Sequence, residues 1–147
     1  MIGLNKQEPE LAIKSLCDLI KSKTKTQWRE PMATTRRVRS GLDHPALSVG
    51  TKVNINTDTA VIVTGIRYQR IQDISEVEAR AEGVECVGFE PMINWGGTDL
   101  YKDYLHNGWG CWTAKESFES LVTLIHGDKF WSKNDWVWVI EFKLLDN

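Results

Sequence analysis

Four glutamates lie close together in the stretch QDISEVEARAEGVE, residues 72–85, and carboxylates can serve as general bases in catalysis. They are Glu76, Glu78, Glu82 and Glu85. On a helix, Glu78, Glu82 and Glu85 share one stripe beside the apolar face. A carboxylate at the border of an apolar face is partly desolvated, which raises its pKa toward the range of a general base. A solvent-facing acidic edge is the alternative, and it accounts for Glu76, Glu78 and Glu85.

A second chemical feature is the cationic segment at residues 21–39, which carries +6 although the whole chain has a net charge of −2. Only Glu30 opposes its basic residues, which are Lys21, Lys23, Lys25, Arg29, Arg36, Arg37 and Arg39. Local positive charge on an acidic protein attracts phosphate groups, while a solvated loop explains the same pattern. Trp28 lies in this segment, where its ring could stack on a base or pack in the interior.

The sequence lacks the motifs of several common classes of enzyme and binding site. It contains no P-loop, GxGxxG, HExxH or GxSxG motif. No apolar run approaches the roughly 18 residues that a membrane helix needs. Neither the cysteines nor the histidines have the spacing of metal ligands or of a disulfide framework; they are Cys17, Cys86, Cys111, His44, His106 and His126. We therefore expect a cytoplasmic protein with no metal, no cofactor and no membrane partner.

The elements that must position these residues belong to one domain, residues 1–147, because the chain is too short for two comfortable cores. Runs rich in β-branched residues predict strands within 48–55, 60–74 and 135–145. Together with three short helices and no regular βαβ alternation, these strands favour an α+β fold on a small, strongly curved sheet.

Local signals predict the three helices. The first spans residues 8–23, where apolar residues repeat at helical spacing. Capping boxes begin the other two, at Ser75 with Glu78 and at Thr113 with Glu116. The expected ends are Gly83 and Gly127, and the expected inward face of the second helix consists of Ile74, Val77 and Ala81.

Two segments lack a clear period. We expect a long cationic loop at about 21–45, and a Trp- and Gly-rich insertion of uncertain structure at about 86–114. In the insertion, packing is favoured over base stacking for Trp95, Trp109 and Trp112.

Three blocks in order, IRYQRIQDISEVEARAEGVE, FESLVTLIHG and WSKNDWVWVIEFKLL, resemble the ASCH-domain family of the PUA-like superfamily. The resemblance covers residues 60–145 and is strongest to members carried by bacteriophages and prophages. Two positions depart from that pattern: Asp135 stands where the family usually has proline, and Val122 where it usually has tryptophan.

The resemblance implies a PUA-like small β-barrel with flanking short helices, in the host cytoplasm if the protein is phage-encoded. It also implies recognition of RNA or a modified nucleoside. One branch hydrolyses the amide of N4-acetylcytidine with a Lys-x-x-Thr motif and a later glutamate, and another is associated with ribonuclease activity. A non-catalytic accessory module that binds nucleic acid, or a host protein through the insertion, is the alternative.

Carried over by position, the family glutamate falls on Glu82. Placing the motif by its distance from the first helix assigns Lys23 and Thr26, whereas aligning Thr35-Arg36-Arg37-Val38 puts Met32 at the lysine position. We favour the first register. Glu82 would then be the general base, Lys23 would stabilise the oxyanion or serve as the base if burial lowers its pKa, and Thr26 would be the nucleophile or position water. The residues expected to contact nucleic acid are Lys25, Trp28, Arg29, Arg36 and Arg37.

Overall fold

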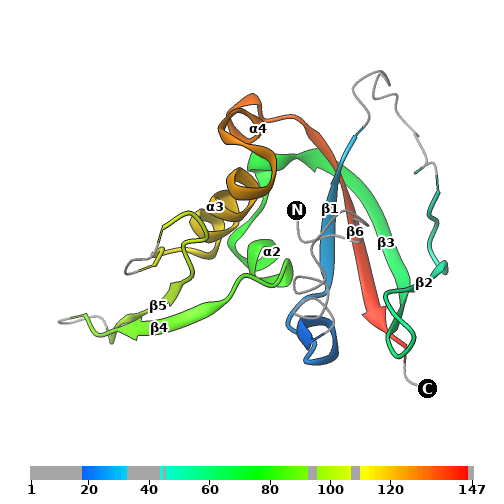
Figure 1. Cartoon of the computed structure of the whole chain (residues 1–147), viewed down its shortest axis with the longest axis horizontal. Coiled ribbons are helices and arrows are strands. Elements are labelled where there is room, and N and C mark those ends of the chain that lie inside the picture. The colour runs from blue at the N-terminus through cyan, green and yellow to red at the C-terminus, as the bar shows by residue number, and fades with distance from the viewer. Residues whose placement is uncertain (1–17, 33–43, 45, 93–95, 107–109, 146–147) are drawn as a thin grey trace.

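The computed structural model describes residues 18–32, 44, 46–92, 96–106 and 110–145 (Figure 1). Its centre is a curled antiparallel sheet of four strands in the order β1-β6-β3-β2. These strands are β1 (Gln27–Pro31), β2 (Lys52–Asn54), β3 (Ala60–Arg70) and β6 (Trp136–Leu144). The sheet forms a half-barrel, which confirms the expected α+β class.

The long pair β3 and β6 forms the middle of the sheet. Arg67 lies opposite Val139 on one side of β6, and Arg29 of β1 lies opposite Val139 on the other. The register between β3 and β6 shifts between Val63 and Gly65, and such an irregularity increases the local bend of a strand. This bend accompanies the curl of the sheet.

Both faces of β6 are covered, which explains why Val137 to Ile140 are all buried. On one face of the sheet, Trp138 and Phe142 of β6 pack with Trp28 of β1 and with residues of β2 and β3. The other face carries Val137, which packs with helical residues such as Phe118. Successive strand residues alternate between the faces, so each face receives every second side chain.

The helices lie on one side of the sheet (Figure 1). They are α2 (Glu76–Ala81), α3 (Ala114–His126) and α4 (Asp128–Lys133), and a 3-10 turn, η1 (Ile71–Asp73), leads from β3 toward α2. The capping box at Ser75 is present, and Thr113 accepts a hydrogen bond from the Glu116 N–H at the start of α3. These two predicted helix starts are therefore confirmed.

Some expectations for the helices were wrong or incomplete. Val77 is 66% exposed, because α2 has only six residues and turns Ala79 rather than Val77 toward the core. Helix α4 was not predicted. Of the helix expected at 8–23, residues 18–21 are helical, and the rest lies outside the described residues.

The expected loop at 21–45 is wrong over Gln27–Pro31, which form β1 and pair with β6. Polar residues at positions 27 and 29 hid the strand, because a buried strand usually shows apolar side chains. The insertion at 86–114 contains a hairpin, β4 (Cys86–Glu90) with β5 (Thr98–Tyr101), which stands away from the four-stranded sheet (Figure 1). In the part of the chain that the structure describes, no helix is long and apolar enough to cross a membrane.

Candidate functional site

Five charged side chains from distant parts of the chain meet between the sheet and α2. We call them the charged cluster; they are Lys25, Arg29, Arg67, Glu78 and Glu82. Lys25, Arg29 and Glu82 are fully buried, whereas Glu78 and Arg67 lead outward to solvent. Burial of charge is costly unless the charges are paired, so three such residues in one place mark a specialised site.

Main-chain contacts bring β1 against the end of α2. The Thr26 N–H donates to the Ala81 carbonyl oxygen at 2.8 Å, which places Lys25 beside Glu82. Gly83 has φ +91°, and a Cβ there would lie 3.1 Å from the Cβ of Lys25. Gly83 is therefore both the residue that can turn the chain after α2 and the one that leaves room for Lys25.

Glu82 forms the C-terminal cap residue of α2 and is the centre of the cluster. Its Oε2 accepts a hydrogen bond from Arg29 Nη1 at 3.2 Å, and its Oε1 lies 3.8 Å from Lys25 Nζ. Lys25 Nζ donates instead to the Glu82 main-chain oxygen at 2.9 Å. Burial raises the pKa of Glu82, although the charges of Lys25 and Arg29 oppose that effect.

Among the described residues, one oxygen in this cluster lacks a hydrogen-bond donor. Glu82 Oε1 is buried and accepts no hydrogen bond from any residue that the structure describes. Buried polar atoms in proteins are nearly always hydrogen-bonded, and the exceptions concentrate at functional sites or where a water or ligand belongs. The oxygen is therefore the open acceptor of the cluster.

All the N–H groups of the Arg29 guanidinium donate hydrogen bonds to side chains within the protein. Its Nη1 donates to Gln27 and Glu82, its Nη2 donates to Gln69 and Glu78 at 2.7 Å each, and its Nε also donates to Gln69. The ring centroid of Phe118 on α3 lies 6.0 Å from the guanidinium carbon. Arg29 thus holds both carboxylates in fixed positions and has no donor left for a phosphate.

Glu78 links the buried part of the cluster to the surface. Burial alone would raise its pKa, but hydrogen bonds from Arg67 and the Ser75 N–H, with the charge of Arg29, outweigh burial and hold the pKa below its usual value. Arg67 contacts Glu78 directly and lies 3.6 Å from Glu141. Glu78 is therefore an ionised partner for two arginines.

The structure brings together only part of the predicted catalytic trio. Glu82 lies in the cluster, but Lys23 and Thr26 are exposed to solvent. Lys23 adopts φ +62°, in the turn that follows the helical residues 18–21. The lysine that reaches Glu82 is Lys25, and the residue three positions later is Trp28, which has no hydroxyl group.

Several predicted nucleic-acid contacts are also buried. Trp28 is 1% exposed, packs on Phe142 with ring centroids 4.8 Å apart, and donates from Nε1 to Glu30 at 2.9 Å. The prediction that Trp28 contacts nucleic acid by stacking on a base is therefore wrong in this structure, because its ring is part of the core. Lys25 and Arg29 are likewise not surface cations, since both belong to the charged cluster. Arg36 and Arg37 lie outside the described residues.

The glutamates predicted as an acidic edge behave differently from one another. Glu76 accepts hydrogen bonds from the Ala114 N–H at 2.5 Å and the Lys115 N–H at 3.0 Å, at the start of α3. Glu78 belongs to the cluster, so only the exposed Glu85 fits the expected edge. Sequence reasoning also missed Gln27 and Gln69, although the polar alternation Lys25, Gln27, Arg29 was the available signal.

The described residues contain no group of three His, Cys, Asp or Glu side chains that could hold a metal ion. A search of protein-family models, of curated proteins and of solved structures finds no match to the chain in any of the three. The ASCH resemblance therefore rests on the three sequence blocks alone, and the charged cluster is the site from which a function can be argued.

Proposed function

We propose that this protein has a PUA-like fold and recognises RNA or a modified nucleoside at the charged cluster. The observation that carries the proposal is the buried Glu82 Oε1, which accepts no hydrogen bond among the described residues. Nucleobases present N–H donors beside carbonyl acceptors, so a base edge can satisfy this oxygen and also accept from a nearby lysine. In the cationic segment 21–39, Lys21 and Lys23 are exposed and supply charge that suits a phosphate backbone.

The geometry supports a pre-organised polar site. Arg29 donates one hydrogen bond to Glu82 and one to Glu78, so the Glu82 oxygen without a donor among the described residues keeps one direction. Because Glu82 is fully buried, the residues around it must move before a ligand can reach this oxygen, but the acceptor itself is already oriented. The ASCH resemblance supports the same ligand class.

Binding of cytidine, N4-acetylcytidine and a short single-stranded RNA by calorimetry tests this proposal. Glu82→Gln is the decisive variant. Its amide oxygen must face Arg29 Nη1, so its NH₂ group replaces the open acceptor with a donor. We expect a loss of affinity of about tenfold or more, which is the effect of leaving one buried polar pair unmade. Equal affinity of the folded variant and the wild type would show that ligand does not use this oxygen.

The matched control uses two lysines that are two positions apart. Lys25→Met removes a buried amine of the cluster, whereas Lys23→Met removes an exposed one. We expect only Lys25→Met to weaken nucleoside binding. Circular dichroism and the unfolding midpoint of each variant separate loss of ligand contact from loss of fold.

Hydrolysis of an N4-acylated cytidine is a second candidate, because Glu82 combines a raised pKa with a neighbouring amine. Turnover by the wild type, Lys23→Ala, Thr26→Ala and Lys25→Ala tests it. Loss in the Lys23 and Thr26 variants would support the Lys-x-x-Thr register, while loss in Lys25→Ala alone would assign the amine to Lys25. A folded wild type that binds N4-acetylcytidine without turnover would leave recognition as the function.

A further inference from the structure

The β4–β5 hairpin is uncovered on both faces of one strand. Cys86, Val87, Gly88 and Phe89 are all exposed, although successive residues of a strand point to opposite faces. Within the described residues β4 pairs with β5 alone, so its outer edge carries unpaired main-chain groups. A two-stranded hairpin is marginally stable in water by itself, and an unpaired edge is a template for another strand.

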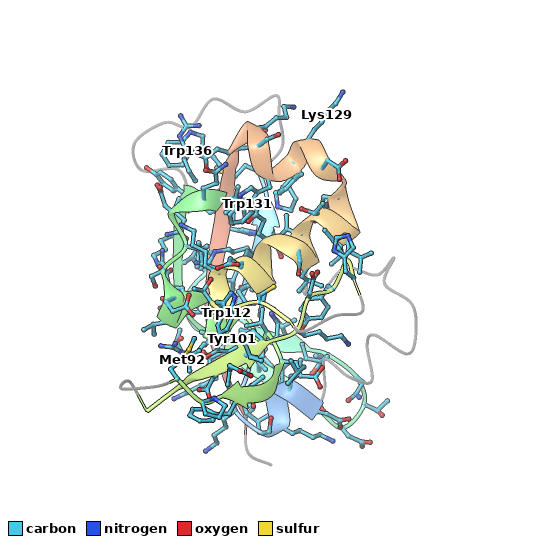
Figure 2. The ribbon with its side chains drawn as sticks, turned by 90° about the vertical axis from the view of Figure 1, so that its left-hand side faces the viewer. Met92, Tyr101, Trp112, Lys129, Trp131 and Trp136 are labelled. Atoms are coloured by element: carbon cyan, nitrogen blue, oxygen red, sulfur yellow. The ribbon has the colours of Figure 1, made fainter. Side chains whose placement is uncertain are left out.

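Large apolar side chains gather on and beside this hairpin. Exposed fractions are 49% for Val87, 56% for Phe89, 37% for Met92 and 48% for Trp112; we call these four the hairpin patch. Trp112 belongs to it because Cys111 pairs with Tyr101 of β5. Figure 2, viewed toward the hairpin, labels Met92 and Trp112, both partly exposed, and the buried Tyr101 of β5. The packing expected for Trp112 is therefore wrong in this structure.

The charge around the hairpin patch indicates which kind of partner it can bind. Residues 85–92 and 96–106 contain Glu85, Glu90, Asp99 and Asp103 against Lys102, a net charge of −3. Such a surface repels a phosphate backbone, which disfavours nucleic acid. A second copy is also disfavoured, because its hairpin carries the same net negative charge and would repel this surface.

We propose that the outer edge of β4 takes an extended segment of a partner protein by strand addition, and that this segment alternates basic with apolar residues. The main chain of the segment pairs with β4, its apolar side chains cover Val87 and Phe89 of β4, and its basic side chains meet Glu85 and Glu90 at the two ends of the strand. This site is separate from the charged cluster and does not depend on the function proposed for it.

The test uses a short, capped, fluorescently labelled peptide in which lysine alternates with valine, and measures its anisotropy with the full chain. Two matched peptides accompany it: one has glutamate in place of lysine, and one carries N-methyl groups on alternate amides along one edge. We expect the lysine peptide to bind, with an affinity that falls as salt is added. The other two should bind about tenfold more weakly or worse.

Variants of the protein locate the contact. Phe89→Ser should weaken binding of the lysine peptide by about tenfold or more, because exposed aromatic residues dominate such contacts. Leu124→Ser, at a side chain that is 57% exposed on α3, should not change its binding. No binding of the lysine peptide, equal binding of the glutamate or N-methylated peptide, or equal weakening by Leu124→Ser would each overturn the proposal. A dimer in sedimentation that Phe89→Ser abolishes would overturn it in favour of a second copy.

Discussion

A shift of two residues decides which lysine belongs to the site. Lys25, Gln27 and Arg29 alternate toward α2, while Trp28 points into the core on the opposite face of the sheet. Lys23 precedes the strand and stays in solvent. Which lysine can act at this site therefore depends on which face of the sheet each residue of the segment occupies. Two residues three positions apart along a strand lie on opposite faces, so a motif with that spacing cannot place both side chains in the site.

At the residue scale, Glu82→Gln should alter the dependence of stability on pH. Burial raises the pKa of Glu82 above 4.5, so the folded protein keeps a proton that the unfolded chain releases as the pH rises past that value. The contribution of Glu82 to wild-type stability is therefore full below 4.5 and is lost as the pH rises toward the folded pKa. The neutral amide does not titrate.

Urea unfolding of both proteins at about pH 4 and about pH 7 measures this effect. The variant should gain stability relative to the wild type as the pH rises. Glu85→Gln, at an exposed carboxylate, should show no such gain. A relative loss of stability in Glu82→Gln at the higher pH would mean that the ion pairs with Lys25 and Arg29 outweigh burial.

At the scale of elements, a side chain of α2 caps the start of α3. The carboxylate of Glu76 accepts from two main-chain N–H groups, those of Ala114 and Lys115. These N–H groups have no partner within the helix, and a negative charge there also interacts favourably with the helix dipole. The two helices are thus joined by a polar contact as well as by the core that Ala79 and Phe118 share.

Replacement of Glu76 should loosen that junction. We expect Glu76→Ala to lower the free energy of unfolding by about 1–2 kcal/mol, as for the loss of a helix N-cap. Urea unfolding checks the value, with Glu85→Ala as the control that removes a carboxylate from the surface. Equal effects of the two variants would show that the contact with α3 contributes nothing beyond the charge.

At the scale of the whole molecule, charge and apolar surface are separated along the chain. The segment 21–39 carries +6, while the hairpin and its surroundings are acidic and expose apolar side chains. A nucleic acid and a basic protein segment would therefore be attracted to different parts of the chain. The two proposals can be tested independently for this reason.

Salt dependence should reveal the phosphate contacts of the cationic segment. If Arg36 and Arg37 each contact a phosphate of single-stranded RNA, their joint replacement by glutamine should reduce the slope of log K against log salt by about 1.4. Lys129→Gln with Lys133→Gln changes the net charge equally at exposed positions of α4. An unchanged slope in the arginine variant would place the phosphates elsewhere.

The sequence by itself determined the elements whose signals are local. Strands β3 and β6 followed from β-branched runs, and the starts of α2 and α3 followed from Ser75 and Thr113, because such patterns act within a few residues. Glu82 was also singled out from its spacing and its resemblance to a family glutamate. The α+β class followed from these elements together.

Only the tertiary structure decided the contacts between distant residues. The pairing of β1 with β6 made a strand from a polar segment, buried Trp28 and set Lys25 rather than Lys23 beside Glu82, 57 residues later in the chain. The exposure of Trp112 likewise depends on a hairpin that no other described strand covers. The periodicity of a sequence indicates which face of a helix or strand is buried. The register and pairing of a strand depend instead on the partner strand that the rest of the chain places beside it.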